Sequence, residues 1–234
     1  METATLLPYC LYVLNNAERE EANKIFGLLE TYIARRMLCH DQTKNYNKLF
    51  AGFITSEILT SDKLKEEFYN KRDTEDRMPT DEDIERLINY NHTNTQIKGL
   101  LYLLETGLRQ PGKETTNILS LQSYDLEHIM PKDHSKWDSP DDTDEIIKNR
   151  ETHIWSIGNK TLLSKGLNKS LKNEIYSKKL NGLSAENPGY KTFAMGLRTF
   201  NVDNYPTWDE DKIDERQKFL IEKIKEVWPY NTVR

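Results

Sequence analysis

The feature that most constrains this chain is a short run that carries acidic, basic and apolar side chains together, residues 124–131 (YDLEHIMP). Two carboxylates and a histidine, Asp125, Glu127 and His128, fall within four positions and are flanked by apolar residues. The apolar residues favour a buried strand, and Pro131 ends it because proline lacks the N–H that a central strand needs. The run is therefore a candidate site carried on a strand.

A second segment, residues 157–163 (IGNKTLL), follows about 30 positions later and predicts a turn at Gly-Asn leading into a short strand. Leu167, Leu171 and Ile175 then recur at i, i+4 and i+8, which is typical of a short amphipathic helix. The intervening residues 132–151 are polar and acidic and are expected to form a loop. Residues 117–180 thus predict a strand, a loop, a strand and a helix in that order.

The remainder of the chain has the periodicity of helices. Apolar residues repeat at helical spacing within six expected helical ranges: 17–38, 45–59, 62–70, 79–88, 94–108 and 207–228. Arg35 and Arg36 near the end of the first range complement a helix dipole or face a partner, and the pattern does not decide between these alternatives. We expect an α+β, mainly α fold: a helical scaffold (1–116), the strand-bearing motif (117–181) and a C-terminal helical region packing on the scaffold (182–234).

Composition excludes several protein classes. No run approaches 18 apolar residues, so no transmembrane helix is expected, and the first 14 residues lack the features of a secretory signal. Cys10 and Cys39 are too few and too far apart for a disulfide framework or a metal knuckle, which favours a reducing cytoplasm. The net charge of −5 argues weakly against a nucleic-acid partner. Six lysines nevertheless gather after the second strand and form either a solvated helix face or phosphate contacts: Lys160, Lys165, Lys169, Lys172, Lys178 and Lys179.

The residue types of the two segments suit phosphodiester hydrolysis. A histidine can deprotonate water, and hard oxygen ligands can hold Mg²⁺, which needs only one or two of them from protein. Asp125 and Glu127 share a strand face, and Asn168 can offer an amide oxygen. His128 points away from Glu127 if the strand is regular, but a bend near Pro131 can bring both to one site. Asn159 in the Gly-Asn turn can hold the loop in shape.

These residues resemble a known signature. The order D-L-E-H-I-M-P, then I-G-N-x-T-L-L, then Asn168 resembles the HNH motif in the C-terminal nuclease domain of GmrSD-type, modification-dependent (type IV) restriction endonucleases, and is similar to the HNH domain of RNA-guided CRISPR nucleases. The resemblance implies a ββα-metal finger with His128 as general base, Glu127 and Asn168 as metal ligands, Asn159 as loop organiser and Asp125 as a further ligand. Lys160 stands where that family leads us to expect leucine, and is a candidate phosphate contact.

The resemblance implies a function, and the residues leave alternatives beside it. We expect a bacterial endonuclease that uses Mg²⁺ or Mn²⁺ to nick or cleave DNA in an anti-phage restriction system, with modified phage DNA as a candidate substrate. The family leads us to expect a nucleotide-hydrolysing sensor domain preceding this region, so the chain is expected to be a C-terminal fragment or one half of a split system. A non-cleaving DNA-binding or interaction module with the same fold is the alternative, and RNA or a modified nucleotide is an alternative substrate.

Overall fold

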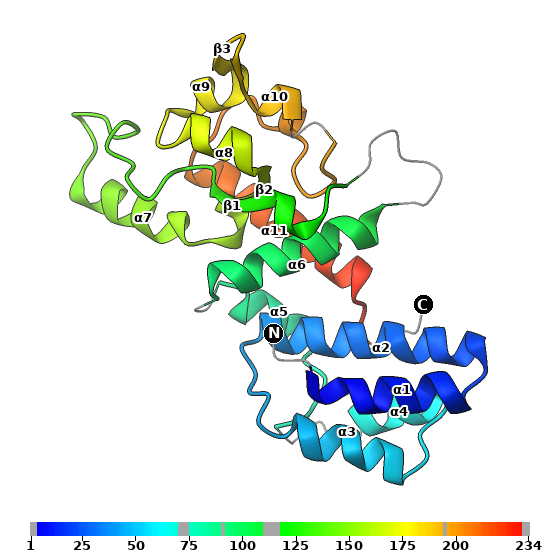
Figure 1. The fold of residues 1–234 in the computed structure, drawn as a ribbon. Coiled ribbons are helices and arrows are strands. Elements are labelled where there is room, and N and C mark those ends of the chain that lie inside the picture. Colours follow the sequence, from blue (N-terminus) through cyan, green and yellow to red (C-terminus); the bar gives the residue numbers. More distant parts are fainter. Residues whose placement is uncertain (1–3, 70–74, 90–91, 110–117, 194–195, 231–234) are drawn as a thin grey trace. The chain divides into compact units, whose positions relative to one another are not determined.

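A computed structural model describes the chain except for residues 1–3, 70–74, 90–91, 110–117, 194–195 and 231–234 (Figure 1). The described part is mainly helical and contains two small two-stranded antiparallel sheets. This confirms the expected α+β, mainly α class. None of the described helices combines the length and the apolar composition needed to cross a membrane.

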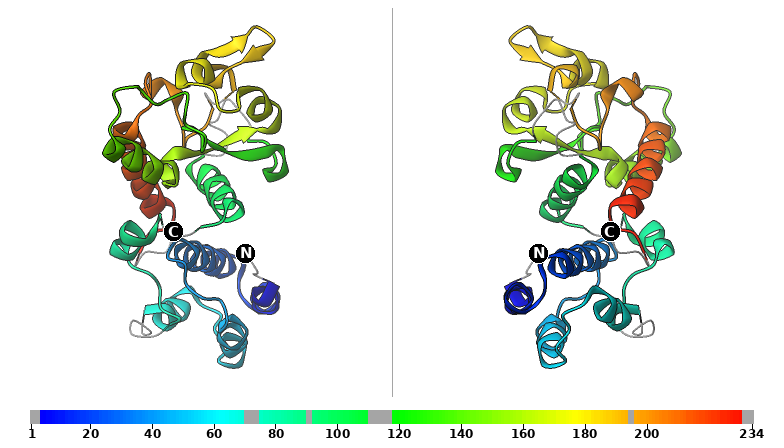
Figure 2. Two further views of the ribbon diagram at one scale, coloured as in Figure 1. Left: turned by 90° about the vertical axis from the view of Figure 1, so that its left-hand side faces the viewer. Right: turned by 90° about the vertical axis from the view of Figure 1, so that its right-hand side faces the viewer.

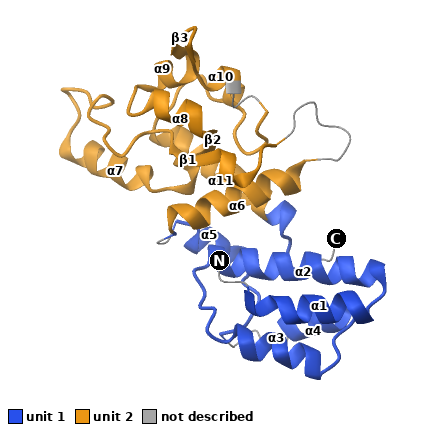
Figure 3. Cartoon of the chain, viewed as in Figure 1, with its two compact units in different colours: residues 1–92, 225–234 blue, residues 93–224 orange. Residues whose placement is uncertain are grey.

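The chain forms two compact units (Figure 3). Unit 1 comprises residues 1–92 and 225–234, and unit 2 comprises residues 93–224. The division differs from the one drawn from sequence, since residues 93–109 and 182–224 belong to the same unit as the strand-bearing motif. Helical periodicity alone could not show this, because it does not reveal which helices share a core.

Unit 1 is a set of helices around one apolar core. Its core is rich in aromatic rings, and Tyr32 stacks on Phe68 with ring centroids 4.0 Å apart. Thr80 caps α5 with a capping box to Asp83. The elements before residue 93 are η1 (Ala4–Leu6), α1 (Leu7–Asn16), α2 (Arg19–Leu38), α3 (Tyr46–Thr55), α4 (Ser61–Tyr69) and α5 (Asp81–Leu87).

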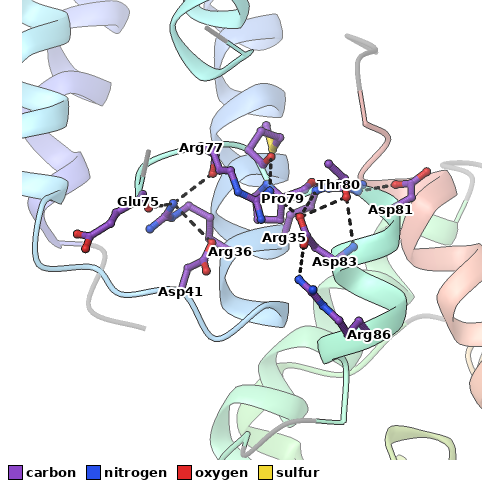
Figure 4. Close-up of polar contacts among 11 residues, drawn as sticks. Arg35, Arg36, Asp41, Glu75, Arg77, Pro79, Thr80, Asp81, Asp83 and Arg86 are labelled. Atoms are coloured by element: carbon purple, nitrogen blue, oxygen red, sulfur yellow. Dashed lines mark hydrogen bonds and ion pairs between the residues drawn. The ribbon is translucent and has the colours of Figure 1, made fainter. Parts of the chain in front are cut away.

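Two arginines of α2 are buried in unit 1 and bind its own backbone (Figure 4). Arg35 donates to the carbonyl oxygens of Pro79 and Trp228 and pairs with Asp81. Arg36 donates to three carbonyl oxygens and to the hydroxyl of Tyr46. Since both guanidinium groups are satisfied inside the unit, they are structural, and the alternative of a partner-facing pair is excluded.

Unit 2 carries the sheets. Helix α11 continues to Val227, so its last residues, from Lys225, belong to unit 1. The elements are α6 (Asn94–Leu108), η2 (Leu121–Ser123), β1 (Tyr124–His128), α7 (Asp144–Ile154), η3 (Ile157–Asn159), β2 (Lys160–Ser164), α8 (Lys165–Leu171), α9 (Tyr176–Asn181), β3 (Gly182–Ser184), β4 (Asn187–Pro188), α10 (Tyr190–Phe193), η4 (Val202–Asn204) and α11 (Glu210–Val227).

Strands β1 and β2 form the centre of unit 2. They pair antiparallel in unbroken register, from Tyr124 opposite Ser164 to His128 opposite Lys160. The ribbon lies between α6 and α8, which both contact it (Figure 1 and Figure 2). Leu162 and Leu163 are buried in this layer. Strand β1 carries Asp125, Glu127 and His128, and Asn168 lies on α8, which follows β2.

Two local expectations are wrong. The predicted loop 132–151 contains most of helix α7, which starts after Thr143, whose side chain accepts a hydrogen bond from the Ile146 amide. The helix expected through Ile175 ends at Leu171, and Ile175 instead precedes α9 with 37% of its surface exposed. Asn117, where the first strand was expected to begin, lies outside the described residues, and β1 begins at Tyr124.

Candidate active site

His128 is the last residue of β1, and its ring sits in a basic and aromatic environment. The ring meets the edge of Trp155 at a centroid distance of 5.9 Å. Its Nε2 atom is buried and has no hydrogen-bond partner among the described residues. A buried ring nitrogen without a partner is costly, and such atoms in native structures call for an unseen ligand or water. The described residues therefore leave one hydrogen-bonding position of this ring unfilled.

The environment of His128 keeps its imidazole neutral. Burial, followed by the charges of Lys160, Lys132 and Lys179, lowers the pKa of His128 to about 4. A neutral imidazole has one acceptor nitrogen, so the ring can take a proton from a bound hydroxyl or water. An anion bound beside these ammonium groups would oppose their charge and raise this pKa again.

Asn159 ties the two strands to the chain on either side. Its fully buried Nδ2 donates to the carbonyl oxygens of Met130 and Ile154, at 2.8 and 3.1 Å. Its Oδ1 accepts from the Met130 amide at 2.8 Å and from the Trp208 indole at 3.2 Å. These four hydrogen bonds fix the backbone just after His128, where the chain leaves β1. The side chain has no capacity left for a substrate.

The side chains of Asp125 on β1 and Asn168 on α8 lie next to each other. Asn168 Nδ2 lies 3.5 Å from Asp125 Oδ2, and both side chains are partly exposed. The two ends of an amide are assigned from hydrogen bonding, so the same position offers either a nitrogen or an oxygen toward the carboxylate. The structure thus brings together two residues that are 43 positions apart in the sequence.

Glu127 has different partners from those expected. Its Oε1 atom accepts from Lys179 Nζ at 2.6 Å and from the hydroxyl of Tyr190 at 2.9 Å. Lys179 Nζ also donates to the backbone oxygen of His128 at 3.0 Å. Burial raises the pKa of Glu127 and lowers the pKa of Lys179 despite their mutual attraction. Desolvation therefore outweighs the ion pair for both groups.

The uninterrupted register of β1 shows which of its side chains share a face of the strand. Neighbouring residues of a regular strand point to opposite faces, and Glu127 contacts Lys179 and Tyr190 while the His128 ring contacts Trp155. The bend expected near Pro131 therefore does not bring these two side chains to one face. Asp125 shares the face of Glu127.

The six lysines proposed for DNA divide into two groups. Lys179 is fully buried against Glu127 and cannot reach a phosphate, so this expectation is corrected. Lys160 is 4% exposed, and burial with the charge of Lys132 lowers its pKa to about 8. The remaining four are exposed, and one of them, Lys178, pairs with Glu174: Lys165, Lys169, Lys172 and Lys178.

The described residues fit a divalent ion only as a sparse oxygen site. They contain no group of three or more His, Cys, Asp or Glu side chains arranged to hold a metal. Asp125 and Asn168 nevertheless place a carboxylate and an amide side by side, and Mg²⁺ binds through one or two protein oxygens with water and phosphate completing its shell. The chemistry of this pair fits the ion, whereas Glu127 Oε1 is already engaged.

Sequence reasoning missed three residues of this neighbourhood. Tyr190 and Trp155 lie outside the two segments, and Lys132 directly follows Pro131. Tyr190 carried no signal because its role depends on the packing of α10 near Glu127. Trp155 and Lys132 lie close to the two segments in the sequence, next to the expected ends of the two strands. This position could have indicated that their side chains lie near the site.

Comparison with known proteins identifies the family. A family model described as "GmrSD restriction endonucleases, C-terminal domain" matches residues 76–223, which is more than half of the chain. The chain belongs to this GmrSD C-terminal domain family. The match contains every residue of the site described above, and it begins in unit 1 and covers nearly all of unit 2. No curated protein and no solved structure matches the chain.

Proposed function

We propose that this GmrSD C-terminal domain is a metal-dependent HNH endonuclease that nicks or cleaves DNA. The observation that carries the proposal is the β1–β2–α8 arrangement, which follows the strand, strand and helix order of a ββα-metal finger within a family of restriction endonuclease domains. In this arrangement His128, whose Nε2 atom has no hydrogen-bond partner among the described residues, lies at the end of β1, and the Asp125–Asn168 pair lies between β1 and α8 on the opposite face of the strand. The proposal therefore requires the substrate phosphate to bridge the two faces at the end of β1.

His128 is the proposed general base. The neutral imidazole accepts the proton of the attacking water, and the described residues leave its Nε2 atom without a hydrogen-bond partner. Asn159 is the proposed organiser, because its four hydrogen bonds hold the backbone at the end of β1 and so fix the direction of the imidazole. Asn159 acts through this geometry and does not touch the substrate.

Asp125 and Asn168 are the proposed metal-binding residues. A divalent ion held there, Mg²⁺ or Mn²⁺, would supply charge stabilisation to the phosphate and the leaving oxygen. Glu127 remains a candidate ligand only through Oε2, because Lys179 and Tyr190 occupy Oε1. We propose that its main contribution is to anchor β1 to α9 and α10.

DNA is the proposed substrate, and the exposed lysines after β2 are its proposed backbone contacts. Lys165, Lys169 and Lys172 are exposed on or just after α8, the helix that carries Asn168. Phosphate contacts of this kind supply sequence-independent affinity. The proposed setting is a cytoplasmic, bacterial anti-phage restriction system in which a nucleotide-hydrolysing sensor domain, in the same or a partner chain, selects modified DNA.

Plasmid cleavage tests the proposal. Supercoiled plasmid is incubated with the wild type, with His128→Ala and with His153→Ala, each with Mg²⁺, Mn²⁺ or EDTA. His153 is a matched control because it lies in unit 2 and pairs with Asp214 instead of facing the site. The proposal expects cleavage by the wild type and His153→Ala with metal, and none by His128→Ala. Equal cleavage by all three proteins contradicts it, and DNA binding without any cleavage supports the non-cleaving module.

A further inference from the structure

Trp155 is a large exposed aromatic side chain beside His128 that the proposed chemistry does not use. It follows the last residue of α7 and leaves 53% of its surface exposed. The His128 ring touches it edge-on, with the ring planes inclined at 82°. Single exposed apolar residues are common, so exposure alone assigns no role. Its two charged neighbours supply the second observation.

Lys132 and Lys160 place two positive charges at this indole. Lys132 Nζ lies 4.8 Å from the ring centroid and Lys160 Nζ lies 6.0 Å from it. Neither forms an ion pair with a carboxylate in the described part of the chain, although the Lys160 side chain is almost fully buried. A buried ammonium without a counter-ion is costly. The cluster is therefore incomplete without an anion.

We propose that Trp155 is a stacking platform for a nucleobase that has left the helical stack, that the exposed Lys132 binds the phosphate of the same nucleotide, and that the buried charge of Lys160 attracts this phosphate from behind the indole. The inference rests on the proposed nuclease function and names its substrate class: DNA with an unpaired or extruded nucleotide next to the cleaved bond. Trp155 supplies an aromatic face, the lysines supply charge, and His128 lies at the edge of the same cluster.

The geometry of duplex DNA explains why the platform selects an unstacked nucleotide. Inside a duplex both faces of every base are covered by neighbouring bases, so an indole can stack only on a base at an end, in a single strand or flipped out. Every base has such a face, so the platform distinguishes DNA structure rather than sequence. Losing one base–aromatic stack weakens binding by about 5- to 100-fold.

The test measures binding apart from cleavage. The 234-residue chain carrying His128→Ala, in EDTA, is titrated against fluorescent oligodeoxynucleotides of equal length: single-stranded, duplex and single-stranded with abasic positions. Trp155→Ala, Trp155→Phe and Ile146→Ala are compared in this background. Ile146 is the matched control, because it is also exposed and lies on α7. Circular dichroism checks that each variant is folded.

The proposal expects Trp155→Ala to weaken single-strand binding by about 5- to 100-fold. Trp155→Phe should stay within a few-fold of the parent, Ile146→Ala should bind like it, and abasic DNA should remove the difference between parent and Trp155→Ala. Equal losses on duplex and single strand, or no loss, overturn the platform. Trp155-dependent binding in a protein that never cleaves plasmid supports the platform while overturning the nuclease proposal, so the two failures are distinct.

Discussion

The buried pair of Glu127 and Lys179 gives a sharp prediction about stability. Both side chains lie in the interior, and Lys179→Met removes the ammonium while keeping most of the apolar stem. Among the described residues, Glu127 is then left buried with the Tyr190 hydroxyl as its one hydrogen-bond partner. Breaking one side of a buried ion pair costs about 3–5 kcal/mol, because the remaining charge is uncompensated.

The destabilisation caused by Lys179→Met has an upper limit that depends on pH. Glu127 can escape its unpaired state by taking up a proton, which costs about 1.4 kcal/mol for each pH unit above the carboxyl's ordinary pKa. That escape costs about 3.5 kcal/mol at pH 7 and about 1 kcal/mol at pH 5. Loss of the ammonium raises the folded pKa of Glu127 further, so the variant gains stability relative to the wild type as the pH falls. We expect a deficit of about 3 kcal/mol at pH 7 that shrinks to about 1 kcal/mol at pH 5.

Urea unfolding in EDTA measures this difference in unfolding free energy. Tryptophan fluorescence is the probe, because three tryptophans (Trp137, Trp155 and Trp208) lie in unit 2. Glu127→Gln combined with Lys179→Met should recover most of the loss, because it leaves no buried charge. Lys178→Met, at an exposed neighbouring position, should change the unfolding free energy by less than about 0.5 kcal/mol. A Lys179→Met deficit that does not depend on pH, or that the double variant does not relieve, would show that an uncompensated Glu127 charge is not its cause.

Three further predictions concern the start of β2. Gly158→Ala places a methyl group against the backbone oxygen of Ile213, an overpacking defect that should destabilise the protein by about 2 kcal/mol or more in a thermal melt. The control Gly166→Ala, in open space on α8, should be neutral or stabilising in the same measurement. Asn159→Ala leaves four buried backbone and indole groups without partners and should cost at least about 3 kcal/mol by urea unfolding; a cost below about 1 kcal/mol would refute its organising role. Because the pKa of Lys160 is lowered to about 8, its charge is lost as the pH rises through that value; affinity for single-stranded DNA should fall from about pH 8 upward in the wild type but not in Lys160→Gln, as measured by anisotropy.

Helices with a clear apolar stripe were predictable, and a helix without one was not. Helix α6 has the predicted bounds, Asn94–Leu108, because its leucines repeat at helical spacing and glycine and proline follow it. Helix α7 was missed because it lies in an acidic segment and buries only Arg150 and Ile154, so it shows no apolar stripe. Its cap at Thr143 was the readable signal.

Those features of the candidate site that depend on local geometry could be predicted from the sequence. The register of β1 and β2 follows from two short apolar runs, and it sets Asp125 beside Asn168 through α8. The burial of Lys179 was not readable. A lysine among other lysines predicts an exposed face, and only the packing of α9 and α10 shows that this one binds Glu127 in the interior.

Imidazole rescue of a variant that lacks the His128 ring is a direct test of His128 as general base. His128→Gly leaves space beside Trp155 where the ring had been, and free imidazole can supply the missing acceptor nitrogen. We expect that His128→Gly does not cleave plasmid with Mg²⁺ or Mn²⁺, that added imidazole restores cleavage in a concentration-dependent manner, and that Asn168→Ala is not rescued. Full activity of His128→Gly without imidazole would show that His128 is not the general base.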